Sequence, residues 1–375
     1  MDQGLLSRRS FLKLAALGFG GWAVRDRRLF TYRPNSPSRL ELVDFPEAER
    51  LGRVSVGKVD IKKAPDEGSE TVGVLYEDAV VPWLREVVGK KPYYINQRWV
   101  DTANGYIYSP YLQPVRNLPN KPVEELLSTN IGNGMWMEIT VPYAETMLEN
   151  EPSSHSWVKA RIEQGLPVRV YYQQVFWVDQ IRTDDQGQAY YRINPNYYGG
   201  VDMLWVLAEV FRPISPEEVQ PIHPGVGSKK IIVDVISQSL SCFEGDTEVY
   251  FCRVSTGAKF DAYGNPVDKW STPLGNHQVT RKYISLQMSG GTTGAGYDLP
   301  GIGWTSIFVT GGVAIHSTFW HNDYGVPRSH GCVNVRPEDA KWIFLWTDPV
   351  VAYNLGASDV SQTGETGTPV EVVEV

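Results

Sequence analysis

Short strand-like segments, separated by turns that contain glycine or proline, recur along most of this chain from residue 51 onward. Residues 52–56, 71–76 and 105–108 are typical, because each combines β-branched or aromatic side chains over a short run. The chain contains 35 Gly, 25 Pro, 20 Tyr and 12 Trp, a composition that favours strands and turns over a helical bundle. At about 100–200 residues per domain, its 375 residues predict two or three domains. The sequence therefore predicts a mainly β protein built of several modules.

The turns and linkers divide the chain into consecutive units. In chain order the predicted units are an N-terminal segment at 1–33, a linker at 34–50, two β-rich modules at 51–115 and 128–215, a third β unit at 229–355 and a tail at 356–375. The tail is expected to be disordered because it lacks aromatic residues and regular hydrophobic spacing. In the third unit, residues 337–346 predict a helix, since proline suits the first helical position and acidic residues suit the positive N-terminal end.

The N-terminal segment has the features of an export signal. Residues 7–13 read Ser-Arg-Arg-Ser-Phe-Leu-Lys, and an apolar stretch follows at residues 14–24. A basic region before a short apolar region is typical of a signal, and the arginine pair indicates the twin-arginine kind. The apolar stretch is shorter than the roughly 20 residues that span a bilayer. We therefore expect export by the twin-arginine translocase to the outside of the cytoplasm. The segment is also a candidate membrane anchor, because a clear cleavage site is missing.

Charge and cysteine content narrow the classes of function. The formal net charge is −8, and the basic residues of the N-terminal segment leave an acidic body, which argues against nucleic-acid binding. There are three cysteines, so at least one thiol stays free. A hairpin turn at residues 245–246 would place Cys242 opposite Val249 rather than Cys252. Both are therefore predicted as buried free thiols.

The third cysteine stands in a run that is typical of a nucleophile. Residues 328–334 read Arg-Ser-His-Gly-Cys-Val-Asn, and His316 ends a strand-like run 16 residues before Cys332. A thiol needs a base to supply thiolate, and imidazole is the usual one. Gly331 lets the backbone approach a substrate carbonyl closely. We expect the N–H groups of Gly331 and Cys332 to face a developing oxyanion.

These residues also fit other roles. Cys332 alone would suit an inert buried thiol. His330 fits a purely structural role in bracing the turn equally well, so both roles stay open for that histidine. A zinc site made of His316, His321, His330 and Cys332 fits no known ligand spacing, so no metal is predicted. His321 is expected to be a solvated loop residue.

Three segments together resemble the catalytic domain of the L,D-transpeptidases (YkuD type). They are residues 272–275 (Thr-Pro-Leu-Gly), 315–317 (Ile-His-Ser) and 329–334 (Ser-His-Gly-Cys-Val-Asn), and the resemblance covers about 230–354. The Ser-His-Gly-Cys block with a histidine at this distance is its most specific part. The family has a β-sandwich-like catalytic domain, crosslinks peptidoglycan stem peptides and needs no metal or organic cofactor.

The β-rich modules show a less extensive resemblance. Residues 96–100 and 105–112 resemble the closing strands of bacterial SH3-like β-barrels, which applies to the module at 51–115. The module at 128–215 could be a second, divergent barrel of this kind. These modules are expected to position the third unit at the wall or to hold it away from the membrane.

The transpeptidase resemblance also implies roles for individual residues. Cys332 is the implied nucleophile, His316 its general base, and the carbonyl group of Ser317 orients the imidazole ring. The backbone of His330, Gly331 and Cys332 is the implied oxyanion hole. The implied substrate-binding residues are Asn334, Arg336, Tyr297, Trp304 and Ser329, and the Gly-rich segment 290–303 resembles a lid over the donor site.

The implied activity is peptidoglycan crosslinking through a thioester on Cys332. A tetrapeptide stem is the donor, and an amine of a neighbouring stem is the acceptor, which gives a 3→3 crosslink. If water takes the acyl group instead, the same residues make an L,D-carboxypeptidase or a crosslink-cutting endopeptidase. A wall-binding protein with an inactive third unit is a further alternative, against which the intact Cys332–His316 pair argues.

Overall fold

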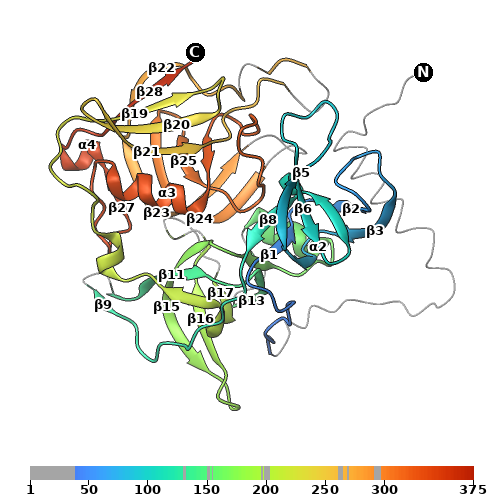
Figure 1. Cartoon of the computed structure of the whole chain (residues 1–375). Coiled ribbons are helices and arrows are strands. Elements are labelled where there is room, and N and C mark those ends of the chain that lie inside the picture. Colours follow the sequence, from blue (N-terminus) through green and yellow to red (C-terminus); the bar gives the residue numbers. More distant parts are fainter. Residues whose placement is uncertain are drawn as a thin grey trace.

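The computed structural model describes residues 39–129, 132–149, 153, 155–195, 197, 203–260, 265–267, 270–290 and 297–375. The predicted export signal and residues 291–296 of the predicted lid lie outside this part of the chain. Within it, no helix is both long and apolar enough to cross a membrane. Strands dominate the described residues, so the predicted mainly β class is confirmed (Figure 1).

The first module, in blue and cyan in Figure 1, is made of two sheets. Its elements are β1 (Leu51–Val54), β2 (Lys58–Lys62), β3 (Thr71–Tyr76), β4 (Val80–Pro82), β5 (Arg85–Val88), β6 (Arg98–Thr102), β7 (Gly105–Tyr108), η1 (Ser109–Tyr111) and β8 (Leu112–Val115). One sheet has the order β4-β1-β8 and the other β3-β2-β7-β6-β5. Fully buried Val54, Val100, Ile107 and Leu112 fill its core. Its SH3-like nature stays a prediction.

The second module is built on a six-stranded sheet of order β13-β17-β16-β15-β11-β18. Its elements are β9 (Ser128–Thr129), β10 (Gly132–Asn133), β11 (Met135–Ile139), β12 (Tyr143–Glu145), β13 (Met147–Leu148), α2 (Ser156–Glu163), β14 (Arg169–Tyr171), β15 (Val175–Thr183), β16 (Ala189–Ile193), β17 (Leu204–Leu207), η2 (Ala208–Val210), β18 (Phe211–Pro213) and η3 (Pro216–Val219). Leu40 and Phe45 are buried in its core. The described part of the predicted linker at 34–50 is therefore packed on the second module through these two apolar side chains.

The C-terminal domain, in yellow to red in Figure 1, consists of two five-stranded sheets and two helices. Its elements are β19 (Lys229–Asp234), β20 (Ser239–Glu244), β21 (Thr247–Arg253), β22 (Gly275–Gln278), β23 (Arg281–Gly290), β24 (Tyr297–Val309), β25 (Val313–Ser317), β26 (Val333–Val335), α3 (Pro337–Trp346), β27 (Ala357–Asp359), α4 (Val360–Thr363) and β28 (Pro369–Val373). The sheets have the orders β21-β20-β19-β28-β22 and β26-β25-β24-β23-β27. The helix predicted at 337–346 is confirmed as α3.

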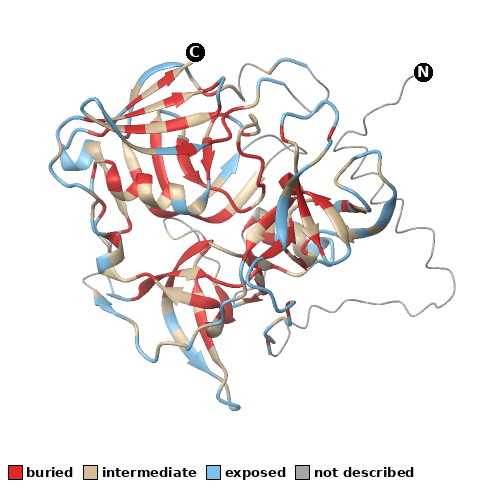
Figure 2. Cartoon of the chain, viewed as in Figure 1, coloured by how far each residue is buried: buried red, intermediate tan, exposed pale blue. Residues whose placement is uncertain are grey.

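A shared apolar core holds the C-terminal domain together and ties it to the second module. Alternating residues of β19, such as Ile231 and Val233, and the α3 residues Ile343 and Phe344 are buried in it. Trp136 of the second module belongs to the same core and donates its Nε1–H to the carbonyl group of Tyr353 at 2.8 Å. Figure 2 shows the buried residues gathered along the strands of each unit.

The two remaining cysteines behave as predicted, with one change of detail. Cys242 and Cys252 are both buried and free. A β-bulge between β20 and β21 places Cys242 opposite Tyr250 instead of Val249. The prediction of two buried apolar thiols is confirmed.

The predicted disordered tail is wrong. β28 lies between β19 and β22, with Val370 parallel to Ile231 on one side. Val370 and Val372 are 1% and 2% exposed, so the tail supplies an interior strand of the sheet. The Val-Glu-Val alternation at 370–372 is the signal of a half-buried strand, and the absence of aromatic residues does not cancel it.

The position of β28 gives a stability prediction. Val372→Ala should lower the free energy of unfolding of the C-terminal domain by about 2 kcal/mol, because it removes buried methyl groups and leaves a cavity. Chemical denaturation followed by tryptophan fluorescence measures the change. Val375→Ala is the matched control, since Val375 is exposed, and it should leave the transition unchanged. Equal effects of the two substitutions would contradict the interior position of β28.

Candidate active site

A cavity of about 300 Å³ surrounds Cys332 and His316. Most of its wall comes from the C-terminal domain, including Tyr297, Trp320 and Asn334. Part of the wall comes from the first module, through Ser55, Val56 and Pro110. The cavity is therefore a joint product of two units far apart in the sequence, which the sequence analysis did not predict.

Pairing of β25 with β26 brings the two central residues together. The strands are parallel, with Ile315 opposite Val333 and His316 opposite Asn334. Since side chains alternate between the faces of a sheet, Cys332, Asn334 and His316 lie on the face toward the cavity. Ile315 and Val333 point the other way and are buried in the core. One strand pair thus brings together two residues that are 16 positions apart in the sequence.

The Cys332 thiol is half-buried and free. Its Sγ atom lies 3.8 Å from the carbonyl oxygen of Gly312, to which the thiol can donate. Burial raises the pKa of the Cys332 thiol to about 11, and a hydrogen bond from the backbone of Ala314 opposes this only in part. At neutral pH the resting group is therefore the thiol.

The His316 ring is oriented as the resemblance implies. It is 2% exposed, and its Nδ1 atom lies 2.8 Å from the carbonyl oxygen of Ser317. A carbonyl oxygen only accepts, so Nδ1 carries the hydrogen and Nε2 keeps its lone pair. Burial lowers the pKa of His316 to about 4, against the raising effect of the Ser317 bond. The ring is therefore a neutral base at pH 7.

The turn before Cys332 is held by two hydroxyl groups. Gly331 has a φ of 122°, a conformation that favours glycine. Thr272 donates its hydroxyl hydrogen to the carbonyl oxygen of Gly331 at 2.9 Å, which explains the 272–275 motif. Ser329 Oγ accepts from the Gly331 N–H at 3.0 Å and donates to the carbonyl oxygen of Cys332 at 2.5 Å.

This bracing corrects one prediction. The Gly331 N–H is engaged by Ser329 in the resting structure, so it does not face the cavity as a free oxyanion donor. Ser329 lines the cavity, but its hydroxyl group serves the turn. His330 is exposed at the cavity rim, with its ring centre 4.5 Å from that of Trp270 and 5.6 Å from that of Tyr297.

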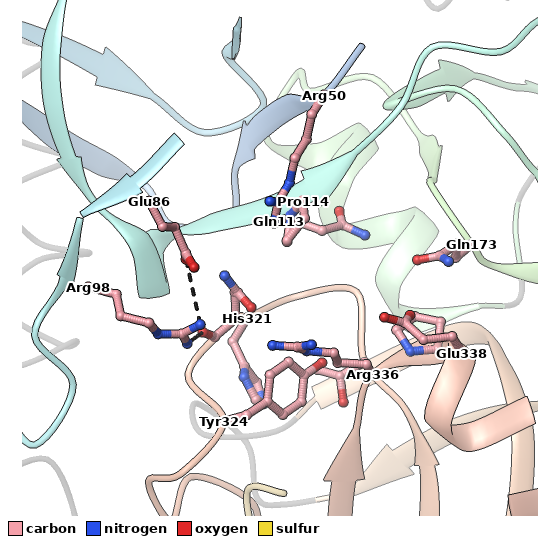
Figure 3. A pocket seen from close by; sticks show the side chains of 13 residues that line it. Arg50, Glu86, Arg98, Gln113, Pro114, Gln173, His321, Tyr324, Arg336 and Glu338 are labelled. Atoms are coloured by element: carbon pink, nitrogen blue, oxygen red, sulfur yellow. Dashed lines mark hydrogen bonds and ion pairs between the residues drawn. The ribbon is translucent and has the colours of Figure 1, made fainter. Parts of the chain in front are cut away.

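The predicted substrate-binding residues divide into two groups. Tyr297 and Asn334 line the cavity. Trp304 does not, because it is 2% exposed and packs on Phe344 in the core of the C-terminal domain. Arg336 is also outside: it precedes α3 and lies over the Tyr324 ring in a neighbouring pocket between the units (Figure 3). Neither residue lines the cavity around Cys332, so their substrate-binding roles have no support from its geometry.

His321 was wrongly predicted as a solvated residue. It is 6% exposed and lines both the cavity around Cys332 and the pocket of Figure 3. Its ring faces Asn334 at 3.0 Å. Nothing in the sequence around it is periodic, so no local signal could have indicated its burial.

No group of three or more His, Cys, Asp or Glu side chains in the described part of the chain is arranged to hold a metal ion. Three of the four ring nitrogens of His316 and His321 have other partners. His316 Nδ1 bonds to a carbonyl oxygen, and His321 bonds to Asn334 and to the backbone of Asp323. The arrangement suits thiol and imidazole chemistry.

Comparison with known proteins agrees with this chemistry. Residues 228–372 match the family model of the L,D-transpeptidase catalytic domain (YkuD). The match includes most of the segment predicted as a tail and ends within β28, at Val372. No curated protein matches the chain.

Similar solved structures share low sequence identity with this chain. A mutant of the Enterococcus faecium L,D-transpeptidase is 22% identical, with a TM-score of 0.28, over 40% of this chain and 52% of that one. The Mycobacterium smegmatis L,D-transpeptidase is 17% identical, with a TM-score of 0.30, over 61% and 91%. For Mycobacterium tuberculosis L,D-transpeptidase 1 the values are 15%, 0.28, 61% and 94%. The chain thus spans about half the length of the first of these proteins.

The pKa values of the pair predict slow labelling of the resting thiol. Because burial raises the Cys332 pKa to about 11, thiolate is scarce at pH 7. Alkylation by iodoacetamide should therefore increase about tenfold per pH unit and level off only near pH 11. Intact-mass spectrometry measures the rate. The control is a Cys332→Ala variant, in which only the buried thiols of Cys242 and Cys252 remain. This variant should not be labelled. A plateau below pH 8 would contradict the prediction.

Proposed function

We infer that this protein, whose residues 228–372 match the L,D-transpeptidase catalytic domain of the YkuD family, is a cysteine acyltransferase that makes 3→3 crosslinks between peptidoglycan stem peptides. One observation carries the proposal. The Cys332 thiol and the neutral, oriented His316 ring lie on one face of paired strands and open into a common cavity. Such a pair has the parts that covalent acyl transfer requires.

The first step forms a thioester. Sγ of Cys332 attacks the carbonyl carbon of the third residue of a tetrapeptide stem, and the thiol proton moves to Nε2 of His316. The bond to the terminal D-alanine then breaks, and His316 returns the proton to the leaving amine. Proton transfer of this kind contributes about 10²–10⁴-fold to a rate.

Cys332 and His316 are both uncharged before the thioester forms, which affects how the proton transfer begins. The raised pKa of Cys332 and the lowered pKa of His316 have the same cause, burial without a compensating charge. Proton transfer is therefore expected to accompany attack on the bound substrate. The negative charge that develops on the carbonyl oxygen needs backbone donors, and the Cys332 N–H is the first candidate.

The second step regenerates the thiol. The side-chain amine of a neighbouring stem attacks the thioester carbon, the carbon–sulfur bond breaks, and the amine proton returns through His316 to sulfur. The product is an amide between the third residues of two stems. If water took the place of the amine, the product would be a tripeptide.

The first module is proposed to shape the donor site. Ser55, Val56 and Pro110 form part of the cavity wall, so a bound stem would contact this module as well as the C-terminal domain. Contact with the wall polymer through other surfaces of the module is a separate expectation from the sequence.

The twin-arginine signal at residues 7–13 is proposed to deliver the folded protein to the cell wall. Two observations support this. The described cysteines are all free, so no disulfide has to form after export. The proposed substrate also lies outside the cytoplasmic membrane.

Substitution of the nucleophile tests the reaction. With a disaccharide tetrapeptide as substrate, Cys332→Ala should lose crosslinked dimers by roughly 10³-fold or more, because the thioester cannot form. Mass spectrometry of the muropeptides measures dimers and tripeptides. Cys242→Ala is the matched control and should retain activity, since Cys242 is buried away from the cavity. Dimers made by Cys332→Ala would refute the mechanism, and tripeptide without dimers from the unaltered protein would indicate hydrolysis.

Substitution of the arginine pair tests export. Replacing Arg8 and Arg9 together by lysine keeps the charge but removes the pair that the twin-arginine pathway reads. The variant should accumulate inside the cell, as measured by fractionation and immunoblotting. Replacing Arg27 and Arg28 by lysine in the same way is the control. Normal export of the Arg8, Arg9 variant would overturn the assignment.

A further inference from the structure

The contact between His321 and Asn334 has a consequence for the cavity. His321 Nε2 lies 3.0 Å from Nδ2 of Asn334, and its Nδ1 accepts from the backbone N–H of Asp323 at 3.2 Å. Oδ1 of Asn334 has no partner among the described residues, although Asn334 is 3% exposed. The His321 ring thus faces two nitrogen donors, whereas the buried Oδ1 atom of Asn334 faces no donor among the described residues.

The protonation state of the ring follows from its surroundings. Burial, together with Arg328 and His316, lowers the pKa of His321 well below its ordinary value, so the ring is neutral. A neutral imidazole carries one hydrogen. The Asp323 N–H is a backbone group that can only donate, so Nδ1 must keep its lone pair. The hydrogen is therefore on Nε2.

The Nε2–H group needs an acceptor, and Asn334 is the group that faces it. The oxygen and nitrogen of an amide have nearly the same shape, so hydrogen bonding decides which one faces the ring. With Oδ1 toward His321, the Nε2–H···Oδ1 bond forms. The NH₂ group of Asn334 then takes the place of the partnerless oxygen.

The backbone fixes where this NH₂ group lies. Asn334 is opposite His316 in the strand pair and two residues beyond Cys332, on the same face. Its backbone N–H and C=O are both bonded to Ser255 at 2.9 Å, so the residue has a fixed position. Asn334 and His321 both line the cavity around Cys332. An amide donor without a partner among the described residues therefore belongs to a residue that lines the cavity.

We propose that His321 is a positioning residue that turns the amide of Asn334 so that its NH₂ group donates to a carbonyl or carboxylate oxygen of the donor stem peptide. The proposal rests on the proposed function. It goes beyond it by giving a role to a histidine outside the Cys332–His316 pair. The Asp323 N–H fixes the tautomer of His321, the His321 ring fixes the orientation of the Asn334 amide, and the amide binds the substrate.

The proposal is tested in the full-length protein by substitutions that remove either the hydrogen bond to Oδ1 of Asn334 or its NH₂ donor. His321→Leu removes the donor to Oδ1. His321→Gln can supply a donor near the position of Nε2. Asn334→Asp keeps an acceptor for His321 but replaces the NH₂ group by an oxygen. Peptide turnover, measured as kcat/KM with the tetrapeptide substrate, should fall about tenfold in His321→Leu and in Asn334→Asp. His321→Gln should stay within about threefold of the unaltered protein.

Coupling distinguishes positioning from a general structural effect. If His321 acts only through Asn334, His321→Leu should change turnover by less than about twofold in the Asn334→Asp background. The reaction of Cys332 with methyl methanethiosulfonate, a small reagent without a peptide carbonyl, should stay within about twofold in all variants. Additive losses, or equal losses in both reactions, would overturn the proposal.

A spectroscopic measurement tests the tautomer directly. A ¹⁵N spectrum of the histidine rings should show His321 as the Nε2–H form near neutral pH, and the Nδ1–H form would overturn the argument. Cys332→Ala separates the two proposals. If it still turns over the peptide, the proposed function fails. If turnover requires Cys332 while His321→Leu is normal, only the role of His321 fails.

Discussion

The parallel pairing of β25 with β26 is the constraint on which the site depends. The register of this strand pair decides which residues share the cavity. His316 is opposite Asn334, and the alternation of side chains places Cys332 on the same face as Asn334. A shift of one residue would exchange these groups with Ile315 and Val333 and bury polar atoms in the core. The apolar residues on the inner face therefore fix the register that the reacting groups require.

The same burial sets the electrostatic character of the site. His316 and His321 lie in one wall without a carboxylate bonded to either ring, and burial lowers the pKa of both. A carboxylate partner would favour imidazolium, whereas the Ser317 carbonyl raises the pKa of His316 too little to offset burial. Burial thus keeps both histidines uncharged, while the Ser317 carbonyl and the Asp323 N–H fix their tautomers. A neutral base can accept the proton of a thiol that is itself undissociated.

Sequence reasoning located the chemistry better than it located the surroundings. Cys332, His316 and Ser317 could be predicted because their spacing is local and their motif specific. Trp304 and Arg336 were misplaced because the face of a strand or the direction of a helix cap depends on tertiary packing. The burial of His321 could not be predicted either, since it results from the first module covering its segment. β28 was missed because the loss of aromatic residues was given more weight than the alternation of Val370 and Val372.

Hydrogen bonds from the first module hold the segment that connects His316 to Cys332. The segment at 318–332 joins His316 to Cys332, and the first module holds it at several points. Arg53 donates to the carbonyl oxygen of Phe319 at 2.9 Å, and Asn96 donates to the Asp323 carboxylate at 3.1 Å. Arg53 is itself buried and paired with Asp78 at 2.7 Å, so its position is fixed within the module. Asp323 in turn donates its backbone N–H to His321.

These contacts form a continuous path from the core of the first module to the wall of the cavity. A module that served only to bind the wall polymer would not need buried hydrogen bonds to the segment between His316 and Cys332. The two roles do not exclude each other. The first module is therefore better understood as part of the active site than as an appended targeting unit, and the C-terminal domain alone would have an incomplete cavity.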